Sequence, residues 1–170
     1  MELIKSIREI ENHPIEGVSF KDITTLLKDP KAYCEAIDVM VEASKDFEFD
    51  LVLAAEARGF IVGAPLAYAC GKGLIPVRKP GKLPAKVLRK EYDLEYGTDF
   101  LEIHEDAIQP GQKVLIVDDL LATGGTAAAM RDLAIELGGE VAGYLYLIEL
   151  GFLDGRSKLG DYPVKSIICY

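Results

Sequence analysis

Short apolar runs alternate with longer amphipathic or alanine-rich stretches through most of the chain. Five runs are expected to be strands: residues 50–55, 74–77, 113–117, 141–150 and 164–169, of which residues 113–117 have the uninterrupted apolar composition of a strand buried on both faces. Three stretches are predicted to be helices: residues 31–47, the segment that follows Gly59 through Cys70, and residues 126–137. This succession of strands and helices predicts an α/β fold with a mostly parallel twisted sheet flanked by helices.

The remaining segments have weaker patterns. The opening residues are expected to form a short helix that ends near Asn12, and residues 16–23 are expected to be irregular. Residues 80–96 are rich in charge, glycine and proline, so we expect them to lack a packed element and to be mobile. Residues 99–104 alternate like an exposed strand.

Composition places the chain among ordinary globular proteins. A length of 170 residues suits a single domain over 1–170, and 49% of the residues are hydrophobic. No apolar run approaches the roughly 20 residues of a membrane helix, and the N-terminus does not have the pattern of a secretory signal. Three cysteines without metal-ligand spacing are expected to be buried free thiols, which favours the cytoplasm.

The charge distribution narrows the choice of ligand. The net charge of −9 argues against a nucleic-acid-binding surface. Residues 78–90 nevertheless hold six basic residues and no acidic one: Arg78, Lys79, Lys82, Lys86, Arg89 and Lys90. A confined basic segment on an acidic chain suggests a small polyanion such as a phosphate ester, although a solvated surface loop has the same composition.

The most specific stretch, VLIVDDLLATGGT at residues 114–126, combines two chemistries on one strand-to-helix turn. Asp118 and Asp119 supply acceptors for neutral hydroxyl groups. Residues 122–126 then open a helix with two glycines between threonines, and the free N–H groups of a helix start bind anions. A ligand with a phosphate at one end and vicinal hydroxyls beside it, such as ribose 5-phosphate, matches both halves.

Two rival classes of nucleotide-binding protein do not fit. A nucleoside triphosphatase would need G-x-x-x-x-G-K-[ST], but Leu66 and Gly73 stand where the motif around Gly71-Lys72 requires glycine and serine or threonine. A nicotinamide-dependent dehydrogenase would need G-x-G-x-x-G after a strand, and the sequence has none.

Six segments together resemble the type I phosphoribosyltransferases and, within them, the adenine phosphoribosyltransferases. They are GVSFKDI (17–23), EARGF (56–60), RKPGKLP (78–84), EYDLEYG (91–97), VLIVDDLLATGGT (114–126) and LDGRSKL (153–159). The resemblance implies a small hood that includes residues 1–30 and a mobile lid at 80–96. It also implies a Mg²⁺-dependent reaction of adenine with phosphoribosyl pyrophosphate that gives AMP and pyrophosphate, carried out by a homodimer.

The same resemblance assigns the residues that would hold phosphoribosyl pyrophosphate. Asp118 and Asp119 would accept the ribose hydroxyls, and Arg58 would contact the departing pyrophosphate as a catalytic residue. The 5-phosphate would lie on Ala122, Thr123, Gly124, Gly125 and Thr126. The basic residues near the pyrophosphate would be Arg78, Lys79 and Lys82. No protein side chain is implied as a direct ligand of Mg²⁺, which would be held by pyrophosphate and ribose oxygens.

A second set of residues is implied for the base. Phe20 and Leu153 would sandwich the purine, and the backbone at Ser19 and Lys21 would read its edge. Lys21 is a departure, because many relatives have arginine there.

Closure of the site is implied for the lid, where Glu95 would be catalytic and Tyr96 would contact the substrate. A lid would also exclude water, which could otherwise hydrolyse the same bond. Two alternatives stay open: a xanthine or hypoxanthine-guanine phosphoribosyltransferase, and a non-catalytic regulator that binds phosphoribosyl pyrophosphate.

Overall fold

The computed structural model describes residues 3–94 and 97–170. The chain divides into two compact units, Met1–Val39 and Met40–Tyr170, which are described separately. Helix α2 (Pro30–Ser44) crosses the boundary between them and confirms the helix expected over 31–47. Within the described residues, no helix is long and apolar enough to cross a membrane.

The first unit is built on a β-hairpin. The 3-10 helix η1 (Leu3–Ser6) is followed by β1 (Arg8–Glu11), β2 (Ser19–Asp22) and the short helix α1 (Thr24–Leu27). The two strands pair antiparallel, and ion pairs join them between Arg8 and Asp22 and between Lys21 and Glu9. The helix expected to end near Asn12 is thus confined to the 3-10 helix at Leu3–Ser6, and the segment 16–23 that was expected to be irregular contains the strand Ser19–Asp22. A mostly polar hairpin held by cross-strand charges has no strong hydrophobic period.

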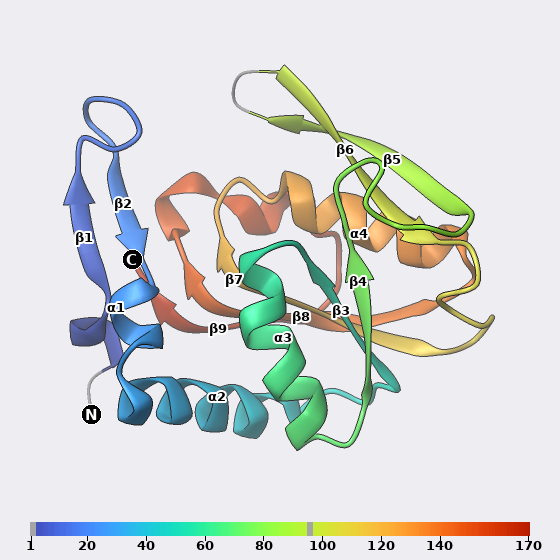
Figure 1. Ribbon diagram of the computed structural model, residues 1–170, viewed down its shortest axis with the longest axis horizontal. Helices are drawn as coiled ribbons and strands as arrows, with labels where there is room; N and C mark the ends of the chain where they lie inside the picture. The colour runs from blue at the N-terminus through green and yellow to red at the C-terminus, as the bar shows by residue number, and fades with distance from the viewer. Residues whose placement is uncertain (1–2, 95–96) are drawn as a thin grey trace. The chain divides into compact units, whose positions relative to one another are not determined.

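The second unit contains the parallel sheet that the sequence predicts (Figure 1). Its strand order is β4-β3-β7-β8-β9, and every neighbouring pair is parallel. The strands are β3 (Leu51–Ala55), β4 (Gly73–Val77), β7 (Lys113–Leu121), β8 (Glu140–Glu149) and β9 (Val164–Cys169). The α/β prediction is confirmed.

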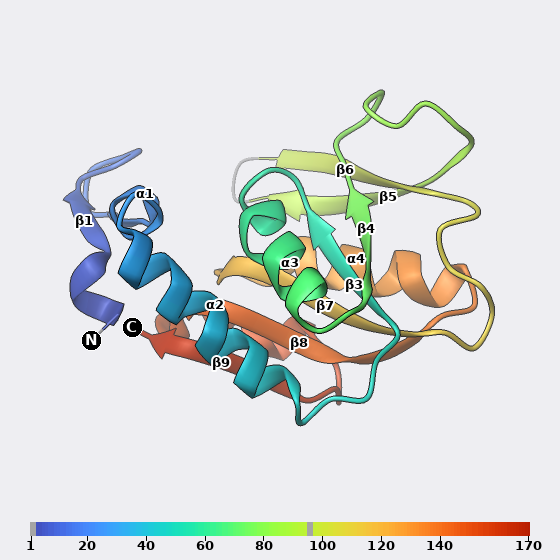
Figure 2. The ribbon, with the colours of Figure 1, turned by 60° about the horizontal axis from the view of Figure 1, so that its bottom comes forward.

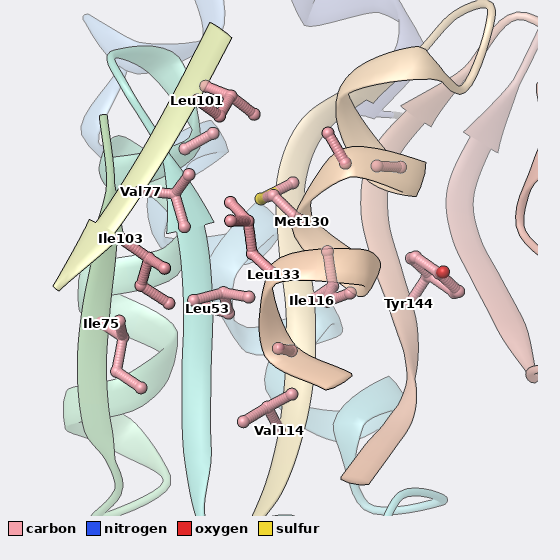
Figure 3. Packing of buried hydrophobic residues seen from close by; sticks show 14 of the residues in the cluster. Leu53, Ile75, Val77, Leu101, Ile103, Val114, Ile116, Met130, Leu133 and Tyr144 are labelled. Atoms are coloured by element: carbon pink, nitrogen blue, oxygen red, sulfur yellow. The ribbon is translucent and has the colours of Figure 1, made fainter. Parts of the chain in front are cut away.

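Helices α3 (Arg58–Ala69) and α4 (Gly125–Glu136) cover opposite faces of this sheet (Figure 2). Gly63 of α3 lies so close to Ala54 that an added Cβ would come within 2.8 Å of its methyl group. Met130 and Leu133 of α4 pack on the other face, with Leu53 and Ile116 (Figure 3). The central strand β7 contacts both helices, so its alternate residues pack on different sides, which explains its uninterrupted apolar run.

A second hairpin corrects the expectation for residues 80–96. Strand β5 (Val87–Leu94) pairs antiparallel with β6 (Gly97–His104), and the hairpin packs along α4 (Figure 1). The second half of the segment expected to lack a packed element is thus a strand. Strand β6 is not exposed throughout either, because Leu101 and Ile103 are buried beside Val77 (Figure 3).

The second unit continues after β8 with two short 3-10 helices, η2 (Gly151–Leu153) and η3 (Gly155–Lys158). The three cysteines are free thiols, but the expectation that they are buried was wrong. Cys34 and Cys169 are exposed and Cys70 is partly exposed. Cys34 lies within α2, Cys70 caps the end of α3 and Cys169 is the last residue of β9, so composition alone could not place them.

Candidate active site

A pocket of about 260 Å³ opens where strands β3 and β7 end, within the second unit. The carboxyl ends of parallel strands are the usual place for a ligand site in this class of fold. Two strand-to-helix turns form most of its wall, residues 55–59 and residues 118–127. The remaining lining residues come from the segment after β4, the β5–β6 hairpin and β8: Lys79, Tyr92, Leu101 and Tyr146.

The start of α4 forms one side of the pocket. Gly124 has a φ of +86° and no side chain caps the helix start, so the first backbone N–H groups remain available to an anion. The structure adds a second reason for both glycines. An added Cβ would lie 2.3 Å from the carbonyl oxygen of Gly155 at position 124, and 2.8 Å from that of Asp93 at position 125.

The acidic pair lies at the end of β7, not in the following loop as expected. Strand β7 continues to Leu121, so Asp118 is paired in register with Tyr146 of β8. Asp118 Oδ1 accepts the backbone N–H of Asp119 at 2.9 Å. Asp119 is 4% exposed, and its Oδ2 lies 3.1 Å from Nε of Arg58. The first turn of α3 therefore lies directly against both carboxyl groups.

The environment of the pair disfavours two negative charges. Burial raises the pKa of Asp118 well above its ordinary value, and the neighbouring Asp119 raises it further. Burial also raises the pKa of Asp119, while Arg58 opposes that change. The two carboxyl groups share one cation, so ionising both of them carries a cost in the empty pocket.

We therefore expect Asp118→Asn to make the free protein more stable at pH 7–8, by several degrees in Tm. The folded-state pKa of Asp118 lies above its unfolded value, so wild-type stability decreases as pH rises above about 3.9. A neutral amide removes this loss. The difference should shrink toward pH 3–4, where the acid is protonated in both states. Thermal unfolding across pH measures it, with the exposed Asp161→Asn as control, and equal Tm values for wild type and Asp118→Asn at every pH would refute the argument.

Two residues of the β5–β6 hairpin hold the side chain of Lys79 at the pocket wall. Its ammonium group donates to Tyr92 Oη at 2.5 Å and to Asp99 Oδ2. Burial acts to lower the pKa of Lys79, but the hydrogen bonds to Asp99 and Tyr92 outweigh it, so the pKa is raised. Lys79 is therefore a fully charged group held at the pocket wall.

Glu56 fixes the segment from which Lys79 projects. Its Oε1 accepts the backbone N–H of Lys79 at 2.6 Å and lies 3.3 Å from Nε of Arg78. The peptide bond between Glu56 and Ala57 is cis. This carboxylate joins the turn after β3 to the end of β4, and it places the charge of Arg78 beside the turn.

The structure brings nine of the predicted residues together around the pocket: Arg58, Lys79, Asp118, Asp119, Ala122, Thr123, Gly124, Gly125 and Thr126. Three others of the second unit, Arg78, Lys82 and Leu153, do not line it. Glu95 and Tyr96 lie outside the described residues.

The remaining predicted residues, Ser19, Phe20 and Lys21, belong to β2 of the first unit. Lys21 is 7% exposed, with its ammonium group 2.7 Å from Glu9. The Phe20 ring meets the His13 ring edge-on, with 5.2 Å between centroids. The side chain of Lys21 is thus engaged within its own hairpin.

Sequence reasoning missed several residues that line the pocket, notably Tyr92, Leu101 and Tyr146. Tyr146 is 1% exposed, so its burial alone does not distinguish it from a core residue. No local motif marks Leu101 or Tyr146, because strand register brings them to the site, and Tyr92 lies in the segment 91–97 without having been singled out there. Gly59 is the exception with a usable signal: an added Cβ there would lie 2.7 Å from Asp118 Oδ1, which explains the glycine after Arg58.

Comparison with known proteins agrees with this geometry. The family described as phosphoribosyl transferase domain matches residues 22–167. The adenine phosphoribosyltransferase of Desulfitobacterium hafniense is 58% identical over 166 residues, which cover 98% of this chain and 96% of the relative.

Two solved structures extend the comparison. The adenine phosphoribosyltransferase of Thermoanaerobacter pseudethanolicus is 56% identical with a TM-score of 0.97, covering 99% of this chain and 98% of that one. The Saccharomyces cerevisiae enzyme, solved with adenine and an imino-altritol bisphosphate, is 40% identical with a TM-score of 0.91, covering 98% and 96%. With a family match over most of its length and full-length relatives of one kind, the chain belongs to the phosphoribosyltransferases, in the adenine phosphoribosyltransferase family.

Proposed function

We propose that the protein transfers the phosphoribosyl group of phosphoribosyl pyrophosphate to adenine and releases AMP and pyrophosphate. One observation carries the proposal: an uncapped helix start and a pair of carboxyl groups face the same pocket, beside Arg58 and Lys79. These are the groups that a phosphate, two ribose hydroxyls and a pyrophosphate require. The full-length relatives named adenine phosphoribosyltransferase support the choice of reaction.

Each part of the sugar phosphate has a partner of suitable chemistry. The 5-phosphate is bound by the backbone N–H groups of residues 122–126 and by the hydroxyl groups of Thr123 and Thr126. The ribose hydroxyls donate to Asp118 and Asp119. This assignment uses the carboxyl groups in their ionised form, which the cationic sugar of the transition state also favours.

The reaction breaks the bond between the anomeric carbon and the pyrophosphate oxygen, which leaves with the electron pair. A ring nitrogen of adenine supplies the electrons of the new bond and loses its proton. Negative charge grows on the leaving group, so Arg58 and Lys79 stabilise it, with Arg78 and Lys82 contributing to the basic surroundings. The lid role is proposed for Glu95 and Tyr96, with Glu95 assisting the proton transfer and Tyr96 contacting the substrate.

Mg²⁺ is the cofactor of this proposal. Among the described residues, no group of three or more histidine, cysteine or acidic side chains could hold a metal ion. When both are ionised, as the ribose assignment requires, the two carboxyl groups carry one more negative charge than Arg58 offsets, which suits an ion that arrives on the ligand's own oxygens. The ion would screen charge on the departing pyrophosphate.

The base is assigned to Phe20 and Leu153 as stacking partners, with the backbone of Ser19 and Lys21 reading its edge. The side-chain contact of Lys21 with Glu9 supports a role through backbone, because the ammonium group is already engaged. We further propose that the protein acts in the cytoplasm as a homodimer.

The test is formation of AMP from adenine and phosphoribosyl pyrophosphate, followed by absorbance, with Mg²⁺ and with excess EDTA. We expect turnover that EDTA abolishes. Arg58→Ala should lower kcat/KM by about 10²–10³, the usual loss for one donor to a developing charge. Arg131→Ala, in the middle of α4 and outside the pocket lining, is the matched control. Turnover of another base and not adenine, or none at all, would reject the assignment.

A further inference from the structure

Tyr146 has a buried hydroxyl group that fold stability does not explain. Its side chain is 1% exposed, and among the described residues its Oη has no hydrogen-bond partner. Leaving a buried hydroxyl unpaired costs free energy, so such a group usually has a partner in some functional state. Tyr146 lines the pocket, which places that missing partner in the site.

The neighbouring Tyr144 shows what a purely structural tyrosine looks like in this strand. Its ring is stacked with that of Tyr146, with 6.4 Å between centroids and 9° between planes. Its Oη donates to the carbonyl oxygen of Leu159 at 3.2 Å, and it does not line the pocket. The two tyrosines share a strand and a sheet face, but only Tyr146 lacks an internal acceptor.

Strand register places the carboxyl group of Asp118 beside Tyr146, and Asp118 is the first charge that acts on this phenol. It is the direct neighbour of Tyr146 across strands β7 and β8, and paired residues of neighbouring strands project from the same face. Burial raises the pKa of Tyr146, and Asp118 adds to the rise, so the phenol stays a neutral donor. An ionised carboxylate in this position needs donors, and the N–H of Asp119 supplies one to Oδ1.

We propose that Tyr146 is a positioning residue for Asp118: its hydroxyl group donates to the ionised Asp118 carboxylate while that carboxylate accepts a ribose hydroxyl. The inference rests on the proposed function through the ribose role of Asp118. The phenol holds the carboxylate in its accepting form and orientation. When Asp118 is protonated, which burial and Asp119 favour, the hydroxyl group of Tyr146 has no carboxylate charge to bind.

Other charges face Asp118 and must be included in any pH argument. Asp119 lies on its own strand, Arg58 on α3 and Tyr146 on β8. Further charged or titratable groups of the pocket wall are Glu56, Lys79 and Tyr92, and Glu149 faces Tyr146 from its own strand. Tyr146→Phe leaves all of these in place and removes one donor from Asp118, so it should raise the pKa of that carboxyl group.

The experiment measures the dissociation constant of ribose 5-phosphate by calorimetry from pH 5 to 9, without metal ion, for wild type, Tyr146→Phe and Tyr144→Phe. Binding should weaken as pH falls through the pKa of Asp118. In Tyr146→Phe this weakening should occur about one unit higher, with affinity at pH 7 lowered about tenfold. Tyr144→Phe should bind like wild type, and titration of the ligand phosphate is common to all three.

A double-mutant cycle with Asp118→Asn tests whether Tyr146 acts on binding through Asp118 or independently of it. If Tyr146 acts through Asp118, its replacement by phenylalanine should change nothing once the carboxylate is an amide. An unmoved pH profile, an equal effect in the Asp118→Asn background, or no binding by wild type would overturn the inference. Adenine turnover is scored separately, so a displaced profile in a protein that does not use adenine would reject the proposed base and keep the role of Tyr146.

Discussion

Replacing Gly125 by glutamate is expected to abolish binding of ribose 5-phosphate, with a loss of about 10³-fold or more in affinity. The new carboxylate would stand at the first residue of α4, where the phosphate is expected to bind. Two unit charges about 4 Å apart near a protein surface repel by about 4 kcal/mol, which corresponds to roughly three powers of ten. Calorimetry with the free ligand measures the loss directly.

Gly125→Gln is the matched control because it has the same shape without the charge. Any side chain at this position must displace Asp93, whose carbonyl oxygen would lie 2.8 Å from the new Cβ. The glutamine variant reports that steric cost, and the difference between the two reports the charge. An acid in the first turn of a helix is favourable for folding. The glutamate variant should therefore melt no lower than the glutamine variant while binding far more weakly, and similar affinities would show that the phosphate lies elsewhere.

Discrimination between bases should be the other large effect, with kcat/KM for adenine about 10⁴-fold above that for hypoxanthine, guanine or xanthine. A site whose backbone groups are placed for one purine edge leaves buried donors and acceptors unpaired when the edge is reversed. The predicted preference for adenine rests on the family membership of the chain, together with the proposed base contacts of Phe20, Leu153 and the segment around Lys21.

Steady-state kinetics with each base, at one saturating concentration of phosphoribosyl pyrophosphate, give the ratio. Phe20→Leu serves as a control, since it removes stacking and should lower kcat/KM for every base without reversing their order. Comparable use of adenine and hypoxanthine by the wild-type protein would contradict the prediction.

The sequence could predict those features of the fold and site for which a local residue pattern has a single structural cause. The run before Asp118 is apolar because both faces of β7 are covered, and Gly124 has the positive φ that the motif suggests. The β1–β2 hairpin and strand β5 could not be predicted this way, since cross-strand ion pairs and packing on α4 stabilise them. The role of Tyr146 could not be predicted for another reason. Tyr144, two residues earlier on the same face of β8, is an ordinary core residue, and the two differ only in their partners on β7, where Tyr146 pairs with Asp118.

The contacts of Lys79 have a thermodynamic consequence for binding. A free lysine side chain loses rotamer freedom when a ligand immobilises it, at a cost of about 1.5–2 kcal/mol. Here Tyr92 and Asp99 already hold the ammonium group, so that entropy is lost when the chain folds and not when the ligand arrives. The saving corresponds to roughly tenfold to thirtyfold in affinity. Both partners lie on the β5–β6 hairpin. Fraying of that hairpin would therefore lower the affinity for a polyanionic ligand, even if every residue in contact with the ligand were unchanged.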